Sequence, residues 1–398
     1  MSLNSDFSQP GVSFHQQIIN ISQREKLTAL PVFIGYADHP EASVLERVQV
    51  TSLQDYYDQF GRDAVRNGGY LADAMRLYFS HGGGQCYVIS LGTLIDDVPS
   101  VTGYDEAFAL LADEPTITLV VLPELPLLDE NQWESVVNQL AICCASSLNL
   151  TGLIDYPSAP ADAEKYNAKW GNEHWAHLAG YWPWVMVSED PAFPTRALRA
   201  VPPGAAVAAK MQQSDKQRGI WYAPANLRLE RVLKPQYDHL TPVTLFHPDP
   251  RSGRSVNQIR SFPGRGVKIW GCRTLSNQPD LRFVYLQNQR LVKWIKQTLK
   301  EAMRPYVFEP NNEITWYRLH AVVRQQLKRL WEQGGLAGGV EDDAYKISVG
   351  LDETMSASEI ASGLLRVRVA VATQRPAEFI HINLDFYLTA EHVAATGG

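Results

Sequence analysis

The 398-residue sequence contains few cysteines. They are Cys86, Cys143, Cys144 and Cys272, and no two of them have the C-x-x-C spacing of many zinc and redox sites. So few cysteines without a repeated spacing argue against a disulfide framework and against a zinc site. We therefore expect no bound metal, and we expect synthesis in a reducing, cytoplasmic compartment.

An excess of positive charge and long apolar runs are also absent. The formal net charge is −7, which argues against nucleic acid as an electrostatic partner. The longest apolar stretches, such as residues 117–122, have the length of a strand and fall far short of a membrane span. Residues 1–10 are polar, unlike a signal segment. We expect no signal peptide, no nucleic-acid binding and no direct insertion into a membrane.

The short motifs of the commoner enzymes are missing. Neither a G-x-x-x-x-G-K-[ST] phosphate loop nor a G-x-S-x-G nucleophile elbow occurs. Gly264-Arg265-Gly266 lacks the third glycine of a dinucleotide-binding loop, and Gly82-Gly83-Gly84 ends a predicted helix instead of starting one. We therefore predict no cofactor.

Isolated polar residues leave one enzymatic alternative open. His174 and His177 could share one face of a helix, but a metal site needs at least a third ligand, and none is identifiable. Asp155 follows a predicted strand, where α/β enzymes often keep catalytic carboxylates, although an aspartate before Tyr-Pro is more often a turn residue. We predict no catalytic residue, and an α/β hydrolase-like enzyme is the alternative from a different functional class.

The pattern of elements predicts a mixed α/β fold of more than one domain. A chain of 398 residues exceeds what one core usually supports. Strands and amphipathic helices alternate through the first half, which indicates a parallel or mixed sheet flanked by helices. The predicted strands cover residues 30–36, 86–91, 117–122, 150–154 and 184–187. Helices are predicted near 53–60, after a Thr51/Gln54 capping box, and at 70–80 and 129–140, the last capped by Asp129.

The second half carries two strong amphipathic helices, predicted at 287–304 and 313–333. A strand at 345–349 and a short helix with a Ser356/Glu359 capping box follow, and Gly363 ends that helix. A basic stripe lies opposite the apolar face of the 287–304 helix, with members three or four residues apart: Arg290, Lys293, Lys296, Lys300 and Arg304. Such a stripe could dock on an acidic partner surface, or it could be an ordinary solvated face.

Both ends of the chain have the alternation of β-strands. Near the amino terminus Val12, Phe14 and Ile18 lie on one face of a strand-like arm. Near the carboxyl terminus, two runs of apolar residues alternate with other residues on either side of a turn: Leu365, Val367, Val369 and Val371, then Ile380, Ile382, Leu384, Phe386 and Leu388. Phe379 precedes the second run. A regular strand near a terminus pairs within its own sheet or with a partner molecule.

A series of phrases resembles contractile tail sheath proteins, found in phage tails, pyocins and extracellular contractile injection systems. The phrases occur in the family's order: 201–204 (VPPG), 218–226 (RGIWYAPAN), 257–260 (NQIR), 270–275 (WGCRTL), 308–311 (FEPN) and 376–380 (PAEFI). Upstream, residues 10–12 (PGV), 33–35 (FIG) and 79–88 resemble the family more weakly, and residues 101–180 have no specific match.

The resemblance implies a division of the chain. Residues 1–25 would be an amino-terminal arm, and residues 364–398 a carboxyl-terminal hairpin or arm. Residues 26–100 together with 201–363 would form the conserved core, and residues 101–200 a variable outer α/β domain. The arm residues Val12, Phe14 and Ile18, and Phe379, Ile380, Ile382, Leu384 and Phe386, would then pair with neighbouring subunits by β-augmentation.

The resemblance also implies a mechanical function. Subunits would polymerise as stacked hexameric rings around an inner tube and contract to drive that tube through a target membrane. The partners would be further copies of the chain, the inner tube protein, baseplate and terminator proteins, and paralogous sheath subunits. The basic stripe is the candidate tube contact. The protein would be made in the bacterial cytoplasm and end in a phage tail or an extracellular tail-like particle. A non-contracting sheath paralogue at the baseplate or terminator is the closer alternative.

Overall fold

The body of the protein is built on one nine-stranded mixed sheet. The computed structural model describes residues 28–37, 43–61, 69–94, 99–111, 116–169, 171–188, 198–237, 245, 248–277 and 284–374. The strand order is β2-β3-β1-β4-β5-β6-β11-β12-β9. Six adjacent strands in the middle of the sheet are parallel to one another: β3 (Cys86–Ser90), β1 (Pro31–Gly35), β4 (Leu119–Val121), β5 (Thr151–Asp155), β6 (Leu178–Trp182) and β11 (Asn257–Phe262). At the two ends, β2 (Val48–Val50), β12 (Gly266–Trp270) and β9 (Leu227–Arg228) pair in antiparallel fashion.

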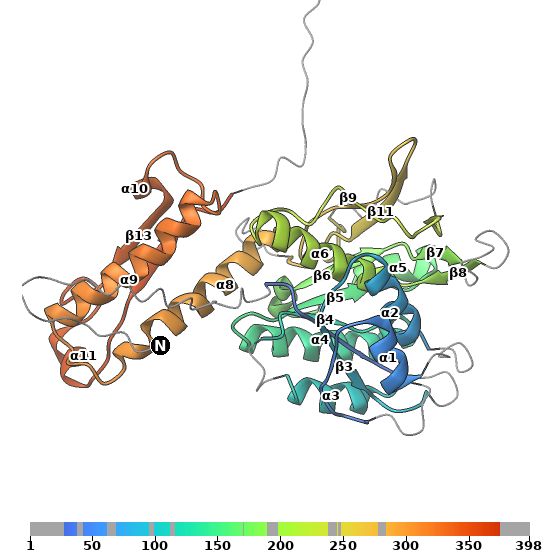
Figure 1. The fold of residues 1–398 in the computed structure, drawn as a ribbon, viewed down its shortest axis with the longest axis horizontal. Coiled ribbons are helices and arrows are strands. Elements are labelled where there is room, and N and C mark those ends of the chain that lie inside the picture. Colours follow the sequence, from blue (N-terminus) through green and yellow to red (C-terminus); the bar gives the residue numbers. More distant parts are fainter. Residues whose placement is uncertain are drawn as a thin grey trace, which may run out of the picture.

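Helices cover both faces of this sheet (Figure 1). One face packs against α1 (Leu53–Phe60), α2 (Leu71–Ser80) and α6 (Gly204–Arg218). The other packs against α3 (Val101–Ala109), α4 (Glu130–Ser146) and α5 (Pro160–Asn167). Phe33 faces the first core and its neighbours Val32 and Ile34 face the second, as expected of a strand buried on both sides. The predicted mixed α/β fold is confirmed.

Two smaller sheets complete the structure. β10 (Lys234–Pro235), β7 (Val185–Ser188) and β8 (Leu198–Val201) form a three-stranded sheet in that order. The second small sheet contains β13 (Tyr345–Ser348) and β14 (Arg368–Val371). Short 3₁₀ helices are η2 (Leu125–Leu127), η3 (Glu173–His177) and η4 (Arg304–Tyr306).

A long helix, α8 (Leu286–Met303), connects the body to a protruding carboxyl-terminal unit (Figure 1). That unit contains α9 (Glu313–Glu332), α10 (Glu341–Ala344), β13, α11 (Ala357–Ala361) and β14. Its core consists of apolar residues from α8, α9 and the two strands. Both amphipathic helices, the strand after them and the Ser356/Glu359 capping box are confirmed. The Asp129 cap is confirmed too, whereas the first helix is capped by Ser52, which accepts a hydrogen bond from the Asp55 N–H, and not by Thr51.

The ranges proposed as separate domains share the large sheet. Strands β1 to β3 come from residues 26–100, β4 to β6 from residues 101–200, and the last three strands of the sheet from beyond residue 200. The expected boundaries at 100 and 200 therefore fall within one continuous layer. The division into a conserved core and a variable outer domain stays a prediction.

Candidate functional site

The two-stranded sheet of the carboxyl-terminal unit has open edges. β13 and β14 are antiparallel, with Tyr345 opposite Val371 and Ile347 opposite Val369. The described part of the chain places no third strand beside either of them. A sheet of two strands is only marginally stable by itself, and its edges are templates for further strands.

The register shows which backbone groups face outward. The Ala372 N–H donates to the Ala344 carbonyl, so Tyr345–Val371 and Ile347–Val369 are the non-hydrogen-bonded pairs of the ladder. The N–H and C=O groups of Val369 and Val371 consequently point away from β13. They are available to a strand that adds beside β14.

The inner face of this sheet is incompletely covered. Tyr345 is buried against α9, whereas Ile347, Val369 and Val371 are only partly buried. An added strand would extend the same apolar layer.

The first run of the predicted terminal hairpin is thus confirmed as β14, paired with β13. The second run, with Phe379, Ile380, Ile382, Leu384 and Phe386, lies outside the described residues, as do Val12, Phe14 and Ile18 of the amino-terminal arm.

A buried ion pair holds the start of the described chain against α8. The Arg290 guanidinium donates to Asp215 Oδ2 at 2.5 Å and to the Thr28 carbonyl at 3.1 Å. The Thr28 hydroxyl also donates to Asp215, at 2.8 Å. The side chains of Arg290 and Asp215 are only 2% and 4% exposed. This cluster joins α6, α8 and Thr28, which lies three residues after the predicted amino-terminal arm.

Lys293 anchors the next turn of α8 to the body. Its ammonium donates to the carbonyls of Cys144 and Leu150, at 2.6 and 2.5 Å. Cys144 lies in the last turn of α4, where the helix dipole favours a cation. Burial lowers the pKa of Lys293 to about 8. Burial and the nearby positive charge of Lys293 together lower the pKa of His177 to about 3. The side-chain nitrogen of Gln289 on α8 lies 2.6 Å from Nδ1 of His177.

The prediction that all five residues of the basic stripe face outward is therefore wrong for two of them. Arg290 and Lys293 are buried inside the subunit and bonded to α6 and to the α4–β5 connection, so neither can present its charge to a partner. The first half of α8 is enclosed on all sides, with Gln287, Asn288 and Gln289 buried as well. Lys296 and Lys300 on the second half of α8, and Arg304 directly after it, remain exposed.

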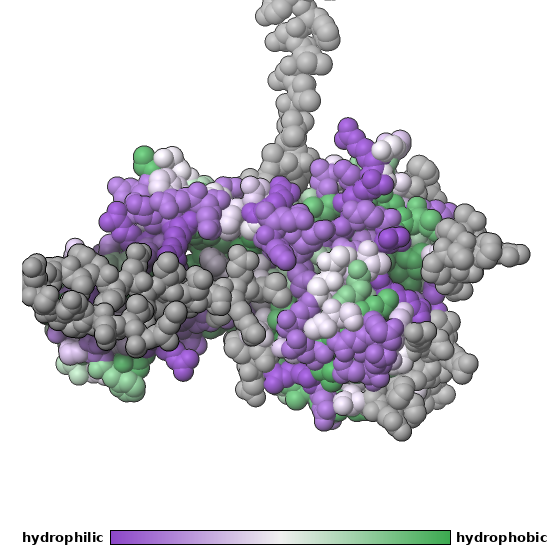
Figure 2. Space-filling view, in the orientation of Figure 1, coloured by the Kyte–Doolittle hydropathy of each residue, from purple (hydrophilic) through white to green (hydrophobic). Residues whose placement is uncertain are grey.

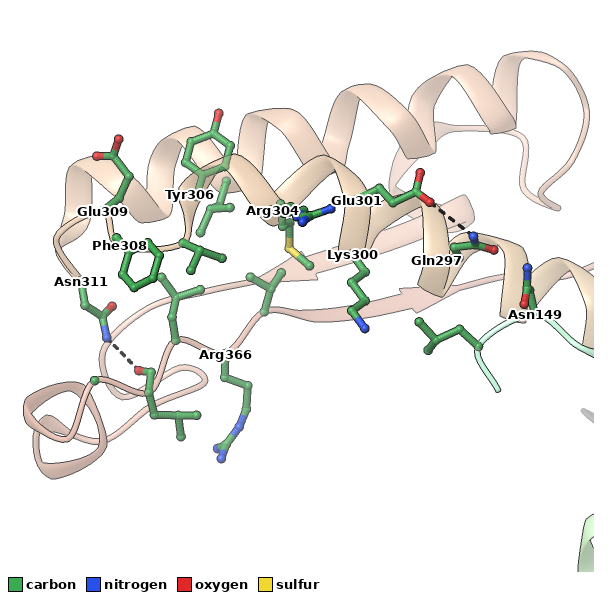
Figure 3. Close-up of a pocket in the computed structure, with 18 of the residues that line it drawn as sticks. Asn149, Gln297, Lys300, Glu301, Arg304, Tyr306, Phe308, Glu309, Asn311 and Arg366 are labelled. Atoms are coloured by element: carbon green, nitrogen blue, oxygen red, sulfur yellow. Dashed lines mark hydrogen bonds between the residues drawn. The ribbon is translucent and has the colours of Figure 1, made fainter. Parts of the chain in front are cut away.

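Lys300 and Arg304 line a groove beneath the second half of α8 (Figure 3). The groove has a volume of about 1220 Å³, and residues 146–149 of the body and 363–367 before β14 form its other walls. Figure 3 shows Lys300 pointing from α8 toward the segment that carries Arg366. At one end lies Phe308, which is fully exposed and has a positive φ of 77°.

The residues considered for enzymatic roles have structural partners. Asp155 ends β5, and its carboxylate caps the amino terminus of α6. Its two oxygens accept hydrogen bonds from the Gly204 N–H at 2.9 and 3.1 Å. Burial raises the pKa of Asp155 to about 8. Glu124, which the sequence reading missed, caps α2 through the N–H groups of Tyr70 and Leu71, and burial raises its pKa to about 7. His174 and His177 lie on η3, and the described residues contain no group of three or more side chains that could hold a metal ion.

None of the helices that the structure describes has the length and apolar character needed to cross a membrane. These observations place the unpaired backbone groups on the β13–β14 sheet edge and the exposed cations along α8, whereas the buried carboxylates of Asp155 and Glu124 cap helix amino termini.

Solved structures of contractile injection systems resemble the whole chain. A chain of the anti-feeding prophage (AFP) baseplate in the contracted state is 33% identical, with a TM-score of 0.81, covering 97% of this chain and 100% of that one. A chain of the contracted AFP helical sheath is 30% identical, with a TM-score of 0.71, covering 95% and 99%. The contracted sheath complex of the extracellular contractile injection system PVC gives 28% identity and a TM-score of 0.72, covering 96% and 98%.

A more distant likeness in fold extends to another sheath tail protein. The sheath tail protein from Listeria innocua is 8% identical, with a TM-score of 0.58 over 87% of this chain and 95% of that one, and it shows the fold alone. No protein-family model and no curated protein sequence matches the chain.

Proposed function

The chain belongs to the family of contractile tail sheath proteins and is a structural subunit, and we propose that it assembles as stacked hexameric rings around an inner tube and contracts to drive that tube through a target membrane. The single observation that supports this most is the likeness over almost the full length of both chains to the contracted AFP sheath. Synthesis in the bacterial cytoplasm and delivery into a tail-like particle are part of the same proposal. Baseplate and terminator proteins and paralogous sheath subunits would be its further partners.

The proposed cohesion between subunits is strand addition at the β13–β14 sheet. The donated strands would be the amino-terminal arm with Val12, Phe14 and Ile18, and the carboxyl-terminal run from Phe379 through Ile380, Ile382 and Leu384 to Phe386. Main-chain hydrogen bonds give such contacts their strength, and alternate side chains fix their register. The outward groups of Val369 and Val371 and the half-covered Ile347 support this sheet as the acceptor.

The buried cluster at Thr28 supports a direct mechanical link. Because Arg290 binds the Thr28 carbonyl, the chain is attached, three residues after the predicted amino-terminal arm, to the helix that carries the acceptor sheet. Tension on the arm would therefore pass into α8 and the carboxyl-terminal unit. The bodies could then move relative to one another while the linked sheets stay together.

The proposed inner-tube contact is restricted to the exposed part of the basic stripe, Lys296, Lys300 and Arg304. We expect the double variant Lys296→Glu/Lys300→Glu to fold and to lose co-assembly with the tube protein by about tenfold, since two lost exposed ion pairs of about 0.7 kcal/mol each amount to about 1.4 kcal/mol. Pelleting of tube-filled particles measures the effect. Lys216→Glu/Arg231→Glu, which reverses two exposed cations of the body, is the matched control. Equal yields from the two variants would remove the tube contact from α8.

A second candidate, a non-contracting sheath paralogue at the baseplate, is supported by the 33% identity with a chain of the AFP baseplate. Oligomer length separates the two candidates. A long cylinder supports the sheath itself, and a single ring supports the paralogue.

A further inference from the structure

Three cations lie directly opposite one another on neighbouring strands of the large sheet. Arg260 of β11 is paired in register with Lys268 of β12, and Lys268 is paired with Arg228 of β9. Directly paired residues project from the same face, and adjacent strands are about 4.8 Å apart, so the three charges form a row about 10 Å long. Like charges in such positions destabilise a sheet.

The described residues do not neutralise this row. Lys268 donates to the side-chain oxygen of Asn226 at 2.7 Å, and the Arg260 guanidinium lies 6.0 Å from the centre of the Phe262 ring. No carboxylate in the described chain forms an ion pair with any of the three cations. Elsewhere in the body, Lys169 pairs with Glu130 and Glu134.

Among the described residues, no helix packs over the cationic face of this end of the sheet. Ile259, Val267 and Ile269 face the core beneath α6, so the row lies on the opposite face, the one that α3, α4 and α5 cover farther along the sheet. Arg228 and Arg260 are exposed, and Trp270 is 37% exposed. Phe262 and Trp270 pack with ring centres 4.7 Å apart. Arginine and aromatic side chains are the types most enriched at protein–protein interfaces.

We propose that this basic sheet face (Arg228, Arg260, Lys268, Phe262 and Trp270) binds the acidic helix α10 of a second copy of the chain. The proposal rests on the self-assembly described under the proposed function. Residues 341–343 (EDD) are the densest run of carboxylates in the described chain. Glu341 is bonded to Arg324 and Tyr345, whereas Asp342 and Asp343 are exposed and have no ion-pair partner among the described residues.

The geometry of one subunit requires the contact to be intermolecular. Figure 1 shows α10 on the protruding carboxyl-terminal unit and β9 and β11 at the top of the body, with α8 between the two parts. A subunit therefore cannot bring its own α10 to its own basic sheet face. Figure 2 shows hydrophilic residues over much of the visible carboxyl-terminal unit and a mixture of hydrophilic and hydrophobic residues at the top of the body. Joining two different surfaces in this way makes a heterologous contact, which continues from copy to copy in rings and helical arrays.

Charge reversal on each side tests the contact. Arg260→Glu/Lys268→Glu removes the cations, and Asp342→Lys/Asp343→Lys removes the carboxylates. We expect each variant to raise the critical concentration for polymerisation of the protein alone by about tenfold or more, because like charges then meet across the interface. Arg231→Glu/Lys234→Glu changes the net charge of the same body by the same amount and should polymerise like the wild type. An equimolar mixture of the two reversed variants should polymerise again, because each supplies the charge that the other needs.

Three results of these experiments would contradict the proposed contact. Normal polymerisation of Arg260→Glu/Lys268→Glu, or failure of the mixture to recover, overturns the proposal. Loss of tube co-assembly with normal self-assembly also overturns it and assigns the face to the tube.

Zero-length carbodiimide cross-linking provides a measurement that does not need polymers. In a mixture of ¹⁴N- and ¹⁵N-labelled wild-type protein, Lys268 should be joined to Asp342 or Asp343 of the other isotope. Absence of mixed-isotope products at Lys268 overturns the contact. If the wild type gives these products without polymerising, the contact stands and the proposed sheath function fails.

Discussion

Replacing Arg290 by alanine is expected to destabilise the subunit strongly. The change leaves the Asp215 carboxylate, which is only 4% exposed, without its cation, and it leaves the Thr28 carbonyl without its donor. Removal of one partner from a buried ion pair costs about 3–5 kcal/mol, because the remaining charge stays buried and uncompensated. Urea denaturation of the isolated subunit, followed by tryptophan fluorescence, measures the loss in the free energy of unfolding.

The exposed pair between Arg324 and Glu341 is the matched control. Arg324→Ala also removes an arginine from an ion pair, but the Arg324 side chain is 56% exposed and water replaces the lost partner. We expect its denaturation midpoint to stay near that of the wild type. Equal midpoints for the two variants would contradict the structural role of the Arg290 cluster.

Deleting residues 378–398 is expected to abolish polymerisation completely while the subunit stays folded. The deletion keeps every described residue, including both strands of the β13–β14 sheet, but it removes the proposed donated strand. Loss of the donor leaves the acceptor edge without its main-chain hydrogen bonds, and we expect the remaining contacts between subunits to be too weak to hold the polymer together. Sedimentation velocity and circular dichroism would show a folded monomer.

The acceptor edge can be tested without shortening the chain. Val369→Pro removes an outward-pointing N–H from β14, so a neighbouring strand loses its donor, whereas Val369→Ile keeps the N–H and serves as the control. The proline variant should behave like the truncation, and the isoleucine variant should polymerise. If the truncated chain still forms cylinders, the carboxyl-terminal run does not link subunits.

Local patterns predicted the elements of the carboxyl-terminal unit well. The alternation of Val367, Val369 and Val371 predicted the strand that became β14, and the Ser356/Glu359 spacing predicted a capping box that the structure confirms. These features depend on residues close together in the chain. The ordered motifs also pointed to the sheath family, which the likeness to AFP chains confirms.

The features that could not be predicted from the sequence depend on contacts between segments that are far apart in the chain. Arg290 and Lys293 looked like a solvated face because helical periodicity reports only on the helix itself. Their partners Asp215 and Cys144 lie 75 and 149 residues away, so the enclosure of this half of α8 could not be read from its pattern. The row of Arg228, Arg260 and Lys268 was hidden for a similar reason, since it exists only once the register of three strands is known.

Electron microscopy of the protein expressed alone and together with its tube protein tests the central claim most directly. A contractile sheath should give hollow striated cylinders in both samples, with longer and narrower particles when the tube is present. Monomers or single rings in both samples would contradict a contractile sheath.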